Sequence, residues 1–132
     1  TIDGFSPISQ ILALFPEDDS ALYLKGVMQQ ESGKYLDALV SLNRALELNN
    51  GVAAYWSARG AVYAATGMHR YAVRDYGMSL DLTADNADVW YLKGISDMEL
   101  GHRQTACFCF RKSARYGKFE ARAYIEKLCG DR

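Results

Sequence analysis

The sequence predicts an all-α protein, a solenoid of stacked helix-turn-helix units. The first observation is an internal repeat with a period of 34 residues, which indicates a stack of small similar units. The second is the spacing of bulky and small side chains at i, i+4 and i+7, which places them on one helical face. The third is the composition, since only 2 prolines and as many as 11 glycines among 132 residues favour helices separated by glycine turns.

The repeat is visible in three columns of small residues. These columns are Gly26, Gly60 and Gly94; Gly33, Gly67 and Gly101; and Ala38, Ala72 and Ala106. The units are residues 19–52, 53–86 and 87–120. The second glycine of each unit divides two helical stretches, because glycine readily adopts the left-handed conformation that ends a helix. The first glycine lies inside a helix, where it costs about 1 kcal/mol of propensity, so we expect a neighbouring backbone to need the space.

These residues resemble the tetratricopeptide repeat, a 34-residue helix-turn-helix family with the pattern W-x2-L-G-x2-Y…G…A-x3-F. The middle unit matches it at Trp56, Gly60, Tyr63, Gly67, Ala72 and Tyr76. The third unit matches at Trp90, Gly94, Gly101, Ala106 and Phe110, and the first at Leu22, Gly26, Gly33, Tyr35, Ala38 and Leu42. The departures are Lys25, Arg59 and Lys93 in the family's Leu column and Gln29 and Asp97 in its Tyr column. The resemblance implies a right-handed superhelix of three tetratricopeptide repeats.

Partial helices are predicted at both ends of this stack. Residues 1–18 are expected to form an N-terminal helix or half-repeat that buries the apolar side chains Ile8, Ile11, Leu12 and Leu14. Residues 121–132 are expected to form a capping helix, because the terminal units of a solenoid need a polar outer face. The side chains that we expect to face inward are Ala123, Tyr124 and Leu128, and those expected to face water are Arg122, Glu126 and Lys127.

Composition and motifs exclude several classes of function. The net charge of -1 provides no basic field for nucleic acid. No apolar run reaches the roughly 18 residues of a membrane-spanning helix, so no membrane insertion is expected. Three cysteines, an odd number, argue against a secreted disulfide framework and predict a cytoplasmic protein. No phosphate-binding glycine loop, nucleophile elbow or paired-histidine zinc motif is present, so we expect no enzyme, no cofactor and no metal.

The resemblance implies that the first helix of each unit lines a concave groove, and this groove is the predicted partner-binding site. Its residues are Tyr23, Leu24, Val27, Gln30, Ser57, Ala58, Ala61, Ala64, Tyr91, Leu92, Ile95 and Met98. The small residues in the middle and the aromatic residues on either side suit an apolar or helical peptide. The alternative is that some of these side chains pack between adjacent helices or against the N-terminal segment.

One partner class within the family is not expected. Members that bind the C-terminal carboxylate of heat-shock chaperones use Lys, Asn and Arg side chains at five groove positions. The residues at those positions in this chain are Tyr23, Val27, Ala58, Asp88 and Leu92. No cation or amide remains there to hold a carboxylate, so heat-shock chaperone tails are not predicted partners.

Protein binding, as an adaptor or assembly scaffold, is the predicted function. Two other hypotheses stay open. The first is a small three-repeat chaperone, like those of bacterial secretion systems, that holds apolar segments of exported proteins. The second is a regulatory sensor in which a small ligand or metal enters the stack. The sequence identifies neither the partner nor whether the chain associates with itself.

The stretch GHRQTACFCF brings His102, Cys107 and Cys109 close together and resembles a metal or redox site. Aligned with the other units, Cys107 takes an apolar column and Cys109 a polar one. Residues at i and i+2 diverge around a helix, so neither a shared metal nor a disulfide is predicted. Phe108 is expected on a partly exposed face, either packed under the C-terminal helix near Tyr124 and Leu128 or forming a second contact surface.

The basic column of Lys25, Arg59 and Lys93 raises the question of an anion-binding ladder. The column lies beside the packed Trp and Gly columns rather than in the groove. Long basic side chains commonly cover apolar surface with their stems while the charge reaches water. We therefore expect a structural role for this column, with its charges in solvent.

Overall fold

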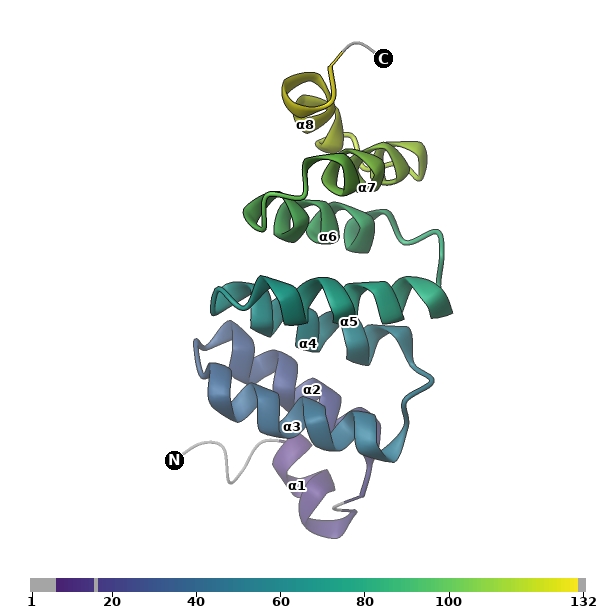
Figure 1. The fold of residues 1–132 in the computed structure, drawn as a ribbon. Coiled ribbons are helices and arrows are strands. Elements are labelled where there is room, and N and C mark those ends of the chain that lie inside the picture. The colour runs from purple at the N-terminus through teal and green to yellow at the C-terminus, as the bar shows by residue number, and fades with distance from the viewer. Residues whose placement is uncertain (1–6, 16, 131–132) are drawn as a thin grey trace.

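The computed structural model describes residues 7–15 and 17–130, and within them the chain forms eight helices and no strand. Figure 1 shows the helices stacked in one column, with α1 at one end and α8 at the other. The predicted all-α solenoid is confirmed. The helices are α1 (Pro7–Leu14), α2 (Asp19–Glu31), α3 (Tyr35–Leu48), α4 (Ala53–Ala65), α5 (His69–Leu82), α6 (Ala87–Glu99), α7 (Arg103–Arg115) and α8 (Ala121–Leu128).

A single glycine ends the first helix of each of the three pairs, as the sequence predicts. Gly33, Gly67 and Gly101 have φ angles of 78°, 80° and 81°, in the left-handed region that favours glycine. At the middle turn the backbone N–H of Met68 donates to the carbonyl of Tyr63 at 2.8 Å, which satisfies one of the last carbonyls of α4. The same hydrogen bond recurs at the other two turns, so the three helix pairs share one turn geometry.

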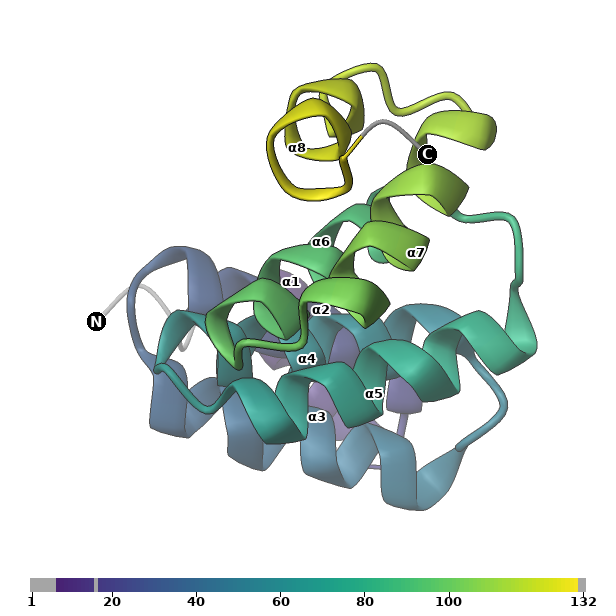
Figure 2. The ribbon, with the colours of Figure 1, turned by 45° about the horizontal axis from the view of Figure 1, so that its top comes forward.

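The helix pairs α2–α3, α4–α5 and α6–α7 stack through contacts of α3 with α4 and of α5 with α6. Figure 2 shows α3, α5 and α7 as one layer in front of α2, α4 and α6. Successive helices among α2, α4 and α6 contact one another more extensively than successive helices among α3, α5 and α7. Closer spacing on one side curves a solenoid toward that side, so α2, α4 and α6 form the concave face. The unit boundaries given by the repeat stay a prediction.

The helix-centre glycines are required by side chains rather than by a neighbouring backbone, which corrects our expectation. A Cβ atom on Gly60 would lie 2.9 Å from Cε1 of Tyr76, and one on Gly94 would lie 2.8 Å from Cε1 of Phe110. Both rings are almost completely buried and belong to the second helix of the same pair. Each glycine therefore makes room for the largest core side chain of its own pair.

The two tryptophans brace the loops that precede their helices. The indole N–H of Trp56 donates to the carbonyl of Asn50 at 2.9 Å, and that of Trp90 donates to Ala84 at 2.8 Å. Both rings are half-buried and pack against core residues of the preceding helix pair. The Trp column therefore joins one unit to the next.

The N-terminal end buries less than the sequence suggests. Helix α1 packs on α2, with Ile8 and Leu12 half-buried, but Ile11 and Leu14 are exposed. The expectation that all four apolar side chains are buried was wrong, because α1 packs mainly against a single helix, α2. Residues 1–6 and Pro16 of the predicted half-repeat lie outside those residues.

At the other end, α8 covers α7 and buries a different face from the one expected. Ala121 is fully buried, and Tyr124, Ile125 and Leu128 pack on the core cluster that contains Phe110. Ala123, predicted to face inward, is exposed. The inward residues recur at intervals of three and four from position 121, so position 123 falls on the outer face.

Substitutions at two glycines of the middle helix pair test whether the close contact with Tyr76 requires a glycine at position 60. We expect Gly60→Ala to lower the free energy of unfolding by about 1–2 kcal/mol, because the clash with Tyr76 outweighs the gain in helix propensity. A Cβ atom on Gly77, inside α5, would meet no neighbouring atom within 4 Å. Gly77→Ala should instead raise the free energy of unfolding by about 0.5–1 kcal/mol. Urea denaturation measures both, and equal effects would contradict the role of the Gly60 contact.

Candidate functional site: the concave face

The twelve predicted groove residues lie on α2, α4 and α6, the three helices of the concave face. Two of them are well exposed: Leu24 on α2 at 47% and Leu92 on α6 at 38%. The remaining ten are half-buried, so their neighbours decide which of them a partner could reach.

On α2, Tyr23 is part of the packing between helices. Its ring stacks on that of Tyr55 at a centroid distance of 5.0 Å. The Tyr55 hydroxyl donates to Oδ2 of Asp19 at 2.7 Å. Burial, followed by this hydrogen bond, raises the pKa of Tyr55 to about 12. Tyr23 and Tyr55 thus hold α2 against α4, and Tyr23 is not a freely mobile anchor.

On α6, Tyr91, Ile95 and Met98 pack against the core cluster of Ala106, Phe110 and Ala121. Tyr91 packs edge-on against Phe110 at 5.9 Å and against Tyr124 at 5.8 Å. Tyr124 in turn stacks on Phe110 at 4.6 Å. Burial raises the pKa of Tyr91, and a hydrogen bond with Tyr124 adds to the effect. Tyr91 therefore belongs to the packing between α6, α7 and α8.

The middle of the concave face, on α4, carries small side chains. Ala54 is exposed, and Ser57 and Ala61 are half-buried. The Ser57 hydroxyl donates to the carbonyl of Ala54 in its own helix. Ala58 and Ala64 instead pack against core clusters, as the alternative of interhelical packing describes. Six predicted groove residues lie outside the core clusters: Leu24, Val27, Gln30, Ser57, Ala61 and Leu92. We call Leu24, Ser57, Ala61 and Leu92 the inner strip.

Behind this face, an ion pair links the two helices of the middle unit. Nε and Nη2 of Arg59 lie 2.8 and 2.9 Å from the two carboxylate oxygens of Asp75, which is buried. Nη1 of Arg59 donates to Asn43 of the preceding unit at 2.9 Å. The hydrogen bonds with Asp75 raise the pKa of Arg59. The guanidinium also lies 5.3 Å from the centre of the Trp56 ring.

The other two units make the same link with different chemistry. In the first unit the Ser41 hydroxyl donates to Oε1 of Gln29 at 2.7 Å. In the third, the Cys109 thiol of α7 lies 3.6 Å from Oδ2 of buried Asp97 on α6, and Nζ of Lys93, on the same helix as Asp97, lies 3.0 Å from that oxygen. The expectation that this basic column extends its charges into water was therefore wrong for Arg59 and Lys93, because each meets a buried carboxylate.

Cys109, predicted in a polar column, is fully buried beside this third link. Its thiol lies 3.6 Å from Oδ2 of Asp97, within donating distance. Burial raises the pKa of Cys109 to about 11, so the thiol is protonated at neutral pH. The described residues contain no group of three or more His, Cys, Asp or Glu side chains that could hold a metal ion.

Cys107 forms a disulfide with Cys129, and the prediction of a free thiol at this position was wrong. In the sequence, the cysteine nearest to Cys107 is Cys109, two positions away on the same helix. The packing of α8 on α7 brings Cys129 beside Cys107 across 22 residues of sequence. Because two of the three cysteines form this disulfide, the cysteine count no longer supports a reducing compartment. The cytoplasmic location stays a prediction.

Phe108 lies on the outer side of α7 and not under α8. Its ring is 53% exposed and packs edge-on against Trp90 at 5.8 Å. Nζ of Lys112 lies 5.6 Å from the ring centre, a cation–π distance.

Among the described residues, no helix is long and apolar enough to cross a membrane.

No protein-family model matches the chain, and no curated protein matches it. Several solved structures match the chain. The first tetratricopeptide domain of RPAP3 bound to an HSP90 peptide has a TM-score of 0.80 at 17% identity, covering 84% of this chain and 90% of that one. YrrB, a tetratricopeptide protein with an unusual peptide-binding site, has a TM-score of 0.85 at 20% identity, covering 91% of this chain and 63% of that one.

A third structure is PcrH in complex with the chaperone-binding region of PopD. It has a TM-score of 0.80 at 19% identity and covers 83% of this chain and 90% of that one. Such identities establish the fold alone, and they confirm the resemblance predicted from the sequence.

The Arg59–Asp75 ion pair is expected to be necessary for stability, because the Asp75 carboxylate is buried. Arg59→Leu should lower the free energy of unfolding by about 3–5 kcal/mol, because Asp75 is left without a cation. Adding Asp75→Ser, the residue type of Ser41, should recover most of the loss. Arg44→Leu removes an exposed arginine that pairs with Glu17 and Glu47, and should cost less than about 1 kcal/mol. Similar losses in Arg59→Leu and Arg44→Leu during urea denaturation would contradict this account.

The disulfide is expected to fasten α8 to α7. Cys129→Ser should lower the free energy of unfolding by about 3 kcal/mol, the usual effect of opening a loop of this length. Hydrogen exchange of residues 121–128 should become faster in the variant. Dithiothreitol should reproduce both effects in the wild type and leave Cys129→Ser unchanged. A wild type that does not respond to dithiothreitol would refute the role.

Proposed function

We propose, from the tetratricopeptide-repeat fold that this chain adopts, that it is a protein-interaction module. It binds an extended or helical segment of a partner on the concave face and acts as an adaptor or assembly scaffold. The observation that carries the proposal is the inner strip, where small α4 side chains lie between exposed leucines of α2 and α6. Such a surface accepts a partner's apolar side chains without first moving its own.

The chemistry of the strip indicates the kind of segment it binds. Leu24 and Leu92 offer apolar contact on the two sides, and Ser57 and Ala61 leave room between them. Glu31 and Glu99, both exposed, follow at the C-terminal ends of α2 and α6. An apolar segment with a flanking basic residue complements this arrangement, since exposed charges of opposite sign steer and orient a partner.

The site differs in two ways from the one proposed on sequence alone. Tyr91, Ile95 and Met98 pack into the core cluster around Phe110, so binding shifts toward α2 and α4. Tyr23 acts through its stack on Tyr55, which keeps the two helices in register. A face held in place before binding loses less conformational entropy, which leaves more of the contact energy for affinity.

The structurally similar proteins support peptide binding in general and argue for a different peptide. The RPAP3 domain carries an HSP90 peptide. In this chain the five positions for carboxylate binding hold Tyr23, Val27, Ala58, Asp88 and Leu92, which present no cation. Asp88 is moreover paired with Lys118 at 2.9 Å. We therefore expect an internal apolar segment of the partner to bind, and not an acidic C-terminus.

The similarity to PcrH in complex with a region of PopD favours one second candidate, a small chaperone for apolar segments of a client. The two functions use the same surface and differ in the state of the partner. A chaperone holds its client unfolded, whereas an adaptor binds a segment of a folded partner. Circular dichroism of a purified complex distinguishes them.

Selection from a phage-displayed peptide library tests the proposal. Peptides that bind the wild type should bind Ala61→Arg at least about tenfold more weakly, because the arginine side chain fills the inner strip. Val40→Arg places the same side chain on the exposed outer face of α3 and should leave the affinity unchanged. Fluorescence anisotropy measures each dissociation constant. Equal affinities for the two variants would exclude the inner strip as the site.

A further inference from the structure

Two hollows at the α7–α8 end form one basic surface. The first lies between the two helices, and Ala114 and Ile125 supply its apolar part. Arg111, Arg115 and Arg122 line it with a single carboxylate, Glu126. The second hollow shares two of these arginines and adds the side chains Phe108 and Lys112.

The aromatic side chains beside this surface are open to solvent. Phe119 is 74% exposed, and the Arg122 guanidinium lies 5.5 Å from the centre of its ring. Residues 103–130 carry seven Lys and Arg and two Glu, a net charge of +5. We call this surface, with Phe119, the basic end.

The opposite end of the stack has the complementary chemistry. A hollow between α1 and α2 is lined by Leu14, Phe15, Glu17, Asp18 and Asp19. Leu14 is 75% exposed and Phe15 62% exposed, although both are large apolar side chains. Residues 7–48 carry six Asp and Glu and three Lys and Arg, a net charge of -3. This surface is the acidic end.

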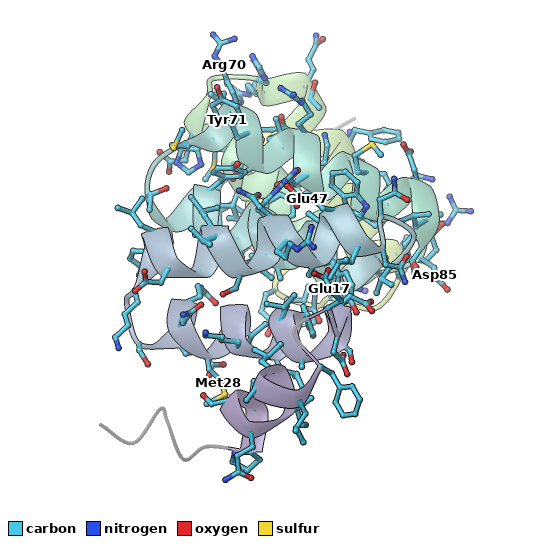
Figure 3. The ribbon with its side chains drawn as sticks, turned by 90° about the horizontal axis from the view of Figure 1, so that it is seen from below. Glu17, Met28, Glu47, Arg70, Tyr71 and Asp85 are labelled. Carbon is cyan, nitrogen blue, oxygen red and sulfur yellow. A yellow bond between two sulfur atoms is a disulfide. The ribbon has the colours of Figure 1, made fainter. Side chains whose placement is uncertain are left out.

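The two surfaces lie at opposite ends of the column, as α1 and α8 do in Figure 1. Figure 3 views the stack from the α1 end, with Glu17 toward α3, where it pairs with Arg44. The carboxylates there also make internal contacts: Glu17 with Arg44, Asp18 with the start of α2, and Asp19 with Tyr55. These contacts hold the acidic groups in place beside the exposed Leu14 and Phe15.

We infer that two copies of this chain associate head to tail, the acidic end of one copy docking on the basic end of the next. Pairing two acidic ends, or two basic ends, would place like charges together, so a symmetric dimer through either surface is disfavoured. A head-to-tail contact leaves one surface unused on each side of the pair, so further copies add to it. The concave face takes no part, and the inference does not depend on the proposed function.

Sedimentation velocity over a range of protein concentrations tests the association. In about 0.02 M salt the wild type should form dimers and longer species as its concentration rises, and in about 0.5 M salt the affinity should fall at least tenfold, because salt screens exposed charges. A wild type that stays monomeric in low salt at every concentration would overturn the inference.

Charge reversal at each end identifies the surfaces. Phe15→Ser with Glu17→Lys alters the acidic end, and Arg115→Glu with Arg122→Glu alters the basic end. Each double variant alone should be monomeric. Mixed together, they should form a 1:1 dimer, because the intact acidic end of one meets the intact basic end of the other. Far-UV circular dichroism verifies that both variants fold.

A matched control reverses two charges away from either end. Arg70→Glu with Arg74→Glu alters exposed arginines of α5, in the middle of the stack, and should associate like the wild type. Association lost equally in this control, or absent from the mixture of end variants, would overturn the inference. Poly-L-glutamate is the last probe: if it saturates the basic end of a chain that does not self-associate, the surface binds an acidic partner instead.

Discussion

The close approach of a helix-centre glycine to the largest core side chain of its pair is the constraint on which the structure depends. Gly60 meets Tyr76, Gly94 meets Phe110, and in the first pair a Cβ on Gly26 would lie 2.7 Å from Cγ of Leu42. A larger residue at any of these positions would push the two helices apart. Since each pair stacks on the next, an altered separation in one pair changes the spacing of the whole concave face.

The polar links between the helices of each pair show that one position in the fold accepts different chemistry. A hydroxyl and an amide occupy it in the first unit, an ion pair in the second, and a lysine, a carboxylate and a thiol in the third. All of these keep the buried polar atoms hydrogen-bonded, which is the requirement that burial imposes. A basic residue in the family's Leu column is therefore accommodated by a carboxylate supplied elsewhere in the same pair.

Helix α8 divides the surface of the stack into parts with different roles. Its side chains Tyr124, Ile125 and Leu128 complete the core around Phe110, and the inner strip stays open. On its other side, Arg122 of α8 and two arginines of α7 line the same hollow, which is part of the basic end. The concave face is apolar with acidic edges, whereas the two ends of the stack carry opposite charges. One chain thus offers an apolar surface and a separate pair of complementary charged surfaces.

The sequence alone determined the helix-turn-helix stack, because spacing along one chain sets both the helical faces and the left-handed glycine turns. It placed the predicted groove residues on the first helices of the three pairs for the same reason. Only the tertiary structure decided which of them stay exposed, since it sets which side chains pack into the core clusters between the helices. It also decided the Cys107–Cys129 pairing, the burial of Cys109 beside Asp97 and the partner of Arg59. These depend on distances between residues 12 to 22 positions apart in the sequence, which the packing of the helices sets.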